Sequence, residues 1–209
     1  MKSALIVGAT GVVGRELVQQ LCQHPDYDLV VAWVRRPFNF EHPKLQVEII
    51  DFDQLGEMPL RAFEEIYCAL GTTIKLAGSK DAFRKVDFVY PVQLAEWGKR
   101  AGTPTFVLVS APGANPDSSF FYLKTKAETE EAVKACDYSR LFVCHPPIIE
   151  GNRPDRRLGE ELSIRFFKCL PKRWVAKYYP MRGADIAAAI LRKVATPSTG
   201  IHYFRPYEV

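Results

Sequence analysis

The chain has 209 residues, 47% of them hydrophobic and 25% charged, and it carries a formal net charge of +4. This balance is typical of a globular protein with one substantial core, and it excludes a disordered or fibrous chain. The basic excess is local, because residues 151–182 hold nine Lys or Arg against three Asp or Glu, and we interpret it as a solvated face rather than a nucleic-acid site.

Short runs of β-branched residues alternate along the chain with longer segments whose apolar residues recur at helical spacing. This alternation predicts an α/β fold of Rossmann type: a doubly wound, mostly parallel sheet of about seven strands with helices on both faces. No linker divides the chain, so residues 1–209 are expected to form a single domain, with residues about 150–180 as a small substrate-side subregion. The strands are expected at residues 3–8, 29–34, 46–50, 65–70, 105–110, 139–144 and 201–205.

Apolar stripes predict helices over residues 12–23, 158–169 and 186–194. Residues 81–100 have the same pattern, but Pro91 has no amide hydrogen to donate to the carbonyl of Asp87. We therefore expect a bend or a restart in that helix.

The first expected strand leads directly into a glycine-rich loop and then into a helix. The loop reads Gly8-Ala9-Thr10-Gly11-Val12-Val13-Gly14. In this context its glycines allow a tight turn, a close approach of backbone amides to a pyrophosphate, and close packing of the helix. The sequence predicts a dinucleotide-binding loop, with contacts from Gly8, Thr10, Gly11, Val12, Val13 and Gly14.

Two arginines, Arg35 and Arg36, follow the second expected strand, about 20 residues beyond the loop. A site specific for NAD(H) would place an acidic residue there to hold the ribose 2′-hydroxyl. Guanidinium groups suit a 2′-phosphate instead, so NADP(H) is predicted over NAD(H). The alternative is an exposed charge pair with no ligand.

Further cofactor contacts are expected where the third and fourth strands end. Asp51 and Phe52 follow the third strand, where a carboxylate and backbone groups would meet the adenine; Asp53 is the alternative acid or the cap of a short helix. After the fourth strand, small and hydroxyl-bearing residues reach the edge of the sheet where ligands of open α/β folds bind. These are Leu70, Gly71, Thr72 and Thr73.

A serine, a tyrosine and a lysine are the candidate catalytic residues. Ser110 ends the fifth strand, and Tyr122 and Lys126 lie four residues apart at the head of an expected helix, on one face, with Lys124 pointing away. A lysine cation favours the ionised phenol that proton transfer at neutral pH requires. Tyr122 would exchange the proton and Ser110 would hydrogen-bond the substrate oxygen, while Lys126 and Tyr122 would also contact the cofactor.

Other residue types exclude further classes of site and of location. Five cysteines without a Cys-x-x-Cys pair indicate reduced thiols, and the four scattered histidines predict no metal. No apolar run approaches the roughly 18 to 20 residues that cross a bilayer. We expect a cytoplasmic protein, without membrane or nucleic-acid contacts, that is a monomer or a homodimer.

These motifs together resemble the atypical branch of the short-chain dehydrogenase/reductase superfamily, and more closely its Tat-interacting-protein oxidoreductase-like family. The resemblance implies an NADPH-bound Rossmann domain with reductase machinery, in which some members act through protein partners. It lies in Gly8 to Gly14, Val34-Arg35-Arg36, Cys68-Ala69-Leu70-Gly71-Thr72-Thr73, Val86-Asp87, Ser110, Tyr122 and Lys126.

One departure from the family pattern follows the sixth expected strand. Many atypical members carry Arg-Pro there, whereas this chain has His145-Pro146. We interpret His145 as a structural hydrogen-bonding residue rather than a catalyst, and we expect Pro146 and Ile148 to line the nicotinamide side.

The leading hypothesis is an NADPH-dependent oxidoreductase that acts on a small carbonyl compound with Tyr122 as proton donor. A non-enzymatic NADP(H)-binding regulator or protein-partner module is the alternative. A third reading is a sugar-nucleotide epimerase or dehydratase. The short carboxyl-terminal part, about 60 residues after the sixth strand, makes a large nucleotide-sugar pocket the less favoured expectation.

Overall fold

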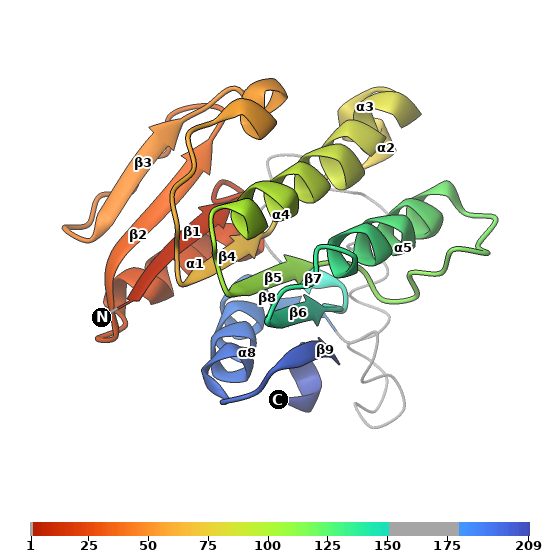
Figure 1. Cartoon of the computed structure of the whole chain (residues 1–209). Helices are drawn as coiled ribbons and strands as arrows, with labels where there is room; N and C mark the ends of the chain where they lie inside the picture. The colour runs from red at the N-terminus through yellow and green to blue at the C-terminus, as the bar shows by residue number, and fades with distance from the viewer. Residues whose placement is uncertain (1, 151–179) are drawn as a thin grey trace.

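A seven-stranded parallel sheet forms the centre of the fold (Figure 1). The computed structural model describes residues 2–150 and 180–209, so the expected helix at 158–169 and nearly all of the 150–180 subregion lie outside the described residues. Within the described ranges the strand order is β3-β2-β1-β4-β5-β6-β9. The α/β Rossmann prediction is confirmed.

All seven expected strands are present, with ends that differ from the prediction by one or two residues. Their β-branched runs place consecutive side chains on opposite faces; both faces are largely buried in the five central strands, whereas the two edge strands are largely exposed. The strands are β1 (Lys2–Val7), β2 (Tyr27–Val34), β3 (Leu45–Ile49), β4 (Glu65–Cys68), β5 (Thr105–Val109), β6 (Arg140–Cys144) and β9 (Gly200–Phe204). A separate pair that the sequence did not predict joins β7 (Ile149–Glu150) to β8 (Met181–Arg182).

Helices cover both faces of the sheet. One face packs against α1 (Val12–Gln23) and α8 (Gly183–Ala195), and the other packs against α4 (Tyr90–Arg100) and α5 (Phe121–Lys134) (Figure 1). Alternation along β1 divides its side chains between the two cores, with Ile6 on the first side and Leu5 on the second.

The expected interruption near Pro91 is an insertion of wider helical turns. The segment begins as α3 (Lys80–Arg84), widens into a π-helix, η2 (Lys85–Val89), and continues as α4, with Pro91 in the first turn of α4. A proline there loses no amide bond that the α-helix needs. Asp87 lies inside η2, and its carbonyl is the one that cannot accept a hydrogen bond from Pro91.

Three short helices complete the described chain. They are the 3-10 helix η1 (Phe52–Glu57) after β3, α2 (Ile74–Ala77) after β4, and the 3-10 helix η4 (Pro206–Glu208) after β9. The chain leaves β1 toward β2 and β3, but the later strands add from β4 outward on the other side. This switch opens a crevice at the carboxyl ends of β1 and β4, the position where open α/β sheets bind ligands.

Candidate active site

The glycine loop between β1 and α1 has no room for a side chain at its first and last glycines. Gly8 has φ +93°, and a Cβ there would lie 2.5 Å from the backbone of Ala69 at the end of β4. A Cβ at Gly14 would lie 2.1 Å from the Gly8 carbonyl oxygen. The first glycine therefore allows the turn against β4, and the last allows α1 to pack onto the loop.

The amino terminus of α1 is left open to a ligand. Gly11 caps the helix without any side-chain hydrogen bond, and its own amide donates to the Gly8 carbonyl at 3.0 Å. The first-turn amides and the helix dipole suit a phosphate group. The tight loop and the uncapped helix fit a dinucleotide pyrophosphate, as the sequence predicts.

A cavity of about 410 Å³ extends from this loop across the crevice. It continues over the ends of β2 and β4 to η2 and the start of α4, through Trp33, Lys85, Val86 and Tyr90. Its size and mixed polar and apolar wall are typical of a small-molecule site. The predicted cofactor residues that line it are Gly8, Thr10, Gly11, Arg35, Phe52, Leu70, Gly71 and Thr72.

Other predicted contacts lie outside the wall of this cavity. Val12, Val13 and Gly14 belong to the first turns of α1, and Thr73 accepts a hydrogen bond from the Leu76 amide as the cap of α2. Arg36 is exposed next to Arg35. Pro146 and Ile148 follow β6 at the carboxyl edge of the sheet, with Pro146 buried.

The two candidate carboxylates after β3 have local partners. Asp51 caps η1 by accepting from the Asp53 amide at 3.0 Å, so Asp51 rather than Asp53 is the cap of the short helix. Asp53 accepts from Tyr90 and Lys85, and these hydrogen bonds, first that of Lys85, lower its pKa. Neither carboxylate lines the cavity, whereas Phe52 between them does.

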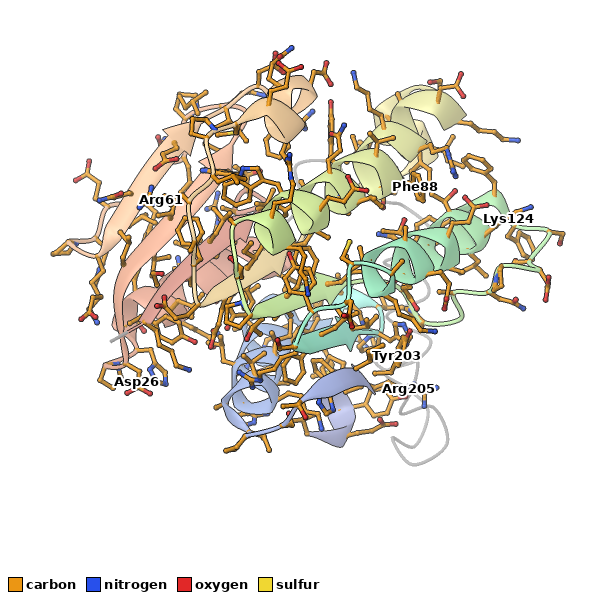
Figure 2. All side chains as sticks on the ribbon, in the orientation of Figure 1. Asp26, Arg61, Phe88, Lys124, Tyr203 and Arg205 are labelled. Atoms are coloured by element: carbon orange, nitrogen blue, oxygen red, sulfur yellow. The ribbon has the colours of Figure 1, made fainter. Side chains whose placement is uncertain are left out.

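Tyr122 and Lys126 lie on successive turns of one face of α5, as their spacing predicts. Lys126 is buried, while Lys124 is exposed at the position labelled in Figure 2. A Cβ on Gly71, which lines the cavity, would lie 3.8 Å from Lys126 Nζ. The lysine therefore lies behind Gly71, and none of the three candidate catalytic residues, Ser110, Tyr122 and Lys126, is among the residues that line the cavity. Tyr122 is 36% exposed, and its ring packs 5.7 Å from that of Phe83 on α3.

Asp87 in η2 forms a buried ion pair with Lys126. Its Oδ1 lies 2.7 Å from Lys126 Nζ, and its Oδ2 accepts from the Thr72 amide at 2.8 Å. Burial disfavours the charged lysine, but the attraction of Asp87 and of Tyr122 outweighs it, so the pKa of Lys126 is raised. The ammonium therefore stays charged at neutral pH beside the tyrosine.

Ser110 is joined to a buried carboxylate. Its hydroxyl donates to Glu130 Oε1 on α5, and His145 Nε2 lies 2.9 Å from the same oxygen. The Ser110 amide donates to the Cys144 carbonyl, and the His145 amide to the Phe204 carbonyl, so both residues are fixed at the ends of adjacent strands. The hydrogen-bonding role expected for His145 agrees with this contact.

Asp87 and Glu130 are site residues that the sequence reasoning missed. One signal was available for Glu130: it follows Tyr122 and Lys126 at the same spacing of four and therefore shares their helix face. Asp87 belongs to the Val86-Asp87 motif of the family resemblance, but that motif assigned it no role, because its contact with Lys126 depends on η2 packing against α5.

Fold, loop and crevice define the class of protein, an NAD(P)-binding Rossmann protein of the atypical short-chain dehydrogenase/reductase type. The model of the NAD dependent epimerase/dehydratase family matches residues 4–141, and the chain belongs to this family. The family resemblance expected from the motifs is confirmed.

Two relatives and one solved structure illustrate the similarity. Protein HTATIP2 of Rattus norvegicus is 33% identical over 204 residues, which are 95% of this chain and 84% of the relative. The mitochondrial protein FMP52 of Saccharomyces cerevisiae is 31% identical over 195 residues, or 88% of this chain and 84% of the relative. MoeE5 in complex with UDP-glucuronic acid and NAD has a TM-score of 0.73 at 16% identity, over 97% of this chain and 75% of that one. This last match shows the fold alone.

Two further observations bear on the other expectations. Within residues 2–150 and 180–209, no helix is long and apolar enough to cross a membrane. Nor do three or more His, Cys, Asp or Glu residues in this part of the chain gather in a way that could hold a metal ion.

Proposed function

We propose that this protein is an NADPH-dependent oxidoreductase that reduces a small carbonyl compound, with Tyr122 as the proton donor. One observation carries the proposal: Lys126 forms a buried ion pair with Asp87, lies behind Gly71, which lines the cavity, and is one helical turn from Tyr122.

Each residue has a distinct task in this chemistry. The bound dinucleotide would supply the hydride. Tyr122 would donate its phenolic proton to the substrate oxygen, and Lys126 would stabilise the resulting phenolate. Asp87 keeps Lys126 protonated and in place, and its hydrogen bond with the Thr72 amide ties the pair to the loop after β4.

Arg35 supports the choice of NADP(H). It is an exposed residue in the wall of the cavity, and no acidic residue among residues 2–150 and 180–209 lines that wall. An exposed guanidinium at the end of β2 can form two parallel hydrogen bonds with a 2′-phosphate. A ribose 2′-hydroxyl would lack the partner that it has in NAD-specific sites.

Tyr122→Phe tests the catalytic role. We expect carbonyl reduction to fall roughly 10²- to 10⁴-fold, because the proton donor is lost, while NADPH affinity stays within about twofold. Tyr207→Phe, in the 3-10 helix after β9, is the matched control and should keep its activity. If Tyr122→Phe keeps full activity, or if a carbonyl panel gives no turnover with the wild type, the regulator or protein-partner module becomes the better assignment.

Calorimetric titration tests the cofactor. The wild type should bind NADPH more than tenfold tighter than NADH, since each charged hydrogen bond to phosphate contributes roughly 1.5 to 3 kcal/mol. Arg35→Ser should remove most of this preference, and the neighbouring Arg36→Ser should remove less, because Arg36 does not line the cavity. Equal affinities for NADPH and NADH in the wild type would show that the assignment of Arg35 is wrong.

The cytoplasm remains our proposal for the compartment, with a monomer or homodimer as the working form. The yeast relatives carry the word mitochondrial in their names, so the location of this protein requires its own measurement. Microscopy of the full chain with a carboxyl-terminal tag would decide between the two compartments.

A further inference from the structure

Ser110, Glu130 and His145 form a buried polar cluster at the carboxyl ends of β5 and β6. Ser110 is 8% exposed and Glu130 is 7% exposed. Glu130 Oε1 accepts a hydrogen bond from the Ser110 hydroxyl and lies 2.9 Å from His145 Nε2. Three elements hold the cluster, since Ser110 follows β5, His145 follows β6 and Glu130 lies on the catalytic face of α5.

The number of protons that a serine hydroxyl can donate decides what Ser110 offers to a ligand. A hydroxyl has one hydrogen and two lone pairs. The hydrogen of Ser110 is directed to Glu130, so only the lone pairs remain. A carbonyl oxygen also has only lone pairs and cannot hydrogen-bond to a serine in this state, whereas an alcohol group can donate to it.

We propose that Glu130 is a positioning residue that sets the direction of the Ser110 hydrogen bond, so that the site selects the alcohol partner of the reaction over the carbonyl partner. The proposal rests on the oxidoreductase function above and goes beyond it, because it assigns Ser110 the role of acceptor. Release of the alcohol product would then be slow in the direction of reduction, and the alcohol would be the better ligand.

His145 helps to position the Glu130 carboxyl group as the acceptor of the Ser110 hydrogen bond. His145 Nε2 lies 2.9 Å from Glu130 Oε1, so with the imidazole as donor this oxygen has a second partner beside the Ser110 hydroxyl. Among the described residues, nearby titratable groups include Cys144 at the end of β6, Tyr203 on β9, whose ring lies 5.9 Å from that of His145, and Glu131 and Lys134 on α5. Tyr203 is labelled on β9 in Figure 2, and burial followed by the charge of Glu130 raises its pKa.

Lys126 and Glu130, on the same face of α5, have separate partners. The Lys126 ammonium is matched by Asp87, and the Glu130 carboxyl is matched by Ser110 and His145. Lys126 therefore does not compensate Glu130, and Glu130 does not weaken the effect of Lys126 on Tyr122 through a direct contact. A variant of Glu130 should change how the substrate oxygen is held, which is a binding effect, more than it changes proton transfer.

Ligand binding to the NADPH-loaded protein tests the proposal without turnover. The probes are cyclopentanol, which carries a hydroxyl, and N-methylpyrrolidone, whose amide carbonyl only accepts and resists hydride. NADPH fluorescence reports binding. In the wild type we expect the alcohol to bind roughly tenfold tighter, as one net hydrogen bond implies. In Glu130→Met the Ser110 hydrogen is free, so amide affinity should rise roughly tenfold, with little change for the alcohol, which can also accept.

Three matched variants separate direction from structure. Ser110→Ala added to Glu130→Met should abolish the gain in amide affinity. Glu130→Gln keeps an acceptor oxygen and should restore the wild-type ratio of the two affinities. Glu131→Met, on the exposed neighbour, should leave that ratio unchanged. An amide affinity that is the same in wild type and in folded, NADPH-binding Glu130→Met would overturn the proposal.

Neutron diffraction from the perdeuterated, cofactor-free wild type gives a second measurement that requires neither a variant nor a cofactor. The hydroxyl deuterium of Ser110 should lie between its Oγ and Glu130 Oε1. A deuterium that points to any other acceptor would overturn the inference. Failure of NADPH to bind would instead overturn the proposed function, and the neutron map would still decide the direction of the Ser110 hydroxyl.

Discussion

At the scale of single residues, burial makes the site depend on pairs of charges. Asp87 is fully buried and Lys126 nearly so, at 2.7 Å from each other. The desolvation of two such groups costs about as much as their attraction returns, so the pair is weak support for stability. Removal of one partner is different, because the other is left buried without compensation.

Lys126→Met should therefore destabilise the fold by about 3–5 kcal/mol, because Asp87 loses its counter-charge. Lys126→Met combined with Asp87→Asn should recover part of this loss, since an amide oxygen can still accept from the Thr72 amide. The free energy of unfolding in urea measures both. The control is Lys124→Met on the exposed side of α5, expected within about 0.5 kcal/mol of wild type. A double variant no more stable than the single one would contradict a charge-based cause.

Site residues could be predicted from the sequence where their relation lies within one element, and not where it depends on contacts between elements. The spacing of Tyr122 and Lys126 is a property of one helix, so it was readable in the sequence. The contacts of Asp87 and Glu130 with Lys126 and Ser110 are established only when η2 and β5 are placed against α5, although the spacing of Glu130 already put it on the face of Tyr122 and Lys126. Asp51 is a different case, because its contact with the Asp53 amide is local, but the sequence favoured Asp53 as the cap.

At the scale of elements, the strands were predictable because their pattern is local and strong. Buried parallel strands read as short β-branched runs, and each expected run became a strand. The position of the interruption before Pro91 was also predictable from the missing amide. Its form, five residues of π-helix, was not, because a wider turn is stabilised by contacts from another helix.

Thr129 on α5 supplies one of those contacts. Its hydroxyl lies 2.8 Å from the Asp87 carbonyl, the group that the amide at position 91 would serve in an uninterrupted α-helix. The same hydroxyl lies 2.8 Å from the Thr125 carbonyl, so its single hydrogen is shared between the two carbonyls. Thr129 is buried, so loss of this hydroxyl leaves the Asp87 carbonyl without a donor from α5.

Thr129→Val should cost about 1–3 kcal/mol, the range for a buried polar group left unsatisfied. Pro91→Ala in that background supplies an amide hydrogen close to the orphaned carbonyl, and the double variant should be more stable than the sum of the single effects predicts. A double-mutant cycle in urea measures this coupling. Strict additivity would mean that Thr129 acts through packing alone.

At the scale of the whole molecule, the ligand site and a buried hydrogen-bond network lie at opposite edges of the sheet. The carboxyl ends of β1 and β4 hold the glycine loop and the cavity. The amino ends hold a buried network in which Glu65 accepts from Tyr27, Tyr67 and Lys2. We therefore expect that stability can be changed at the amino edge while the ligand site at the carboxyl edge stays intact.

The pH dependence of unfolding should reveal this network. Burial, followed by the charge of Glu65, raises the pKa of Tyr27 and that of Tyr67 in the folded state. In the unfolded chain tyrosines ionise near pH 10, while the folded protein keeps these protons. The unfolded state therefore binds fewer protons, and stability is complete below about pH 10 and falls as pH rises above it.

Tyr27→Phe separates the hydrogen bond from the titration. At pH 8 the variant should be about 1 kcal/mol less stable than wild type, because Glu65 loses one donor. Above pH 10 the wild type should lose up to about 1.4 kcal/mol per pH unit more than the variant, so the two curves should meet near pH 11. Urea unfolding from pH 8 to 11 measures this, with NADPH affinity at pH 8 expected unchanged. Parallel stability curves would mean that Tyr27 ionises as easily in the folded state as in the unfolded one.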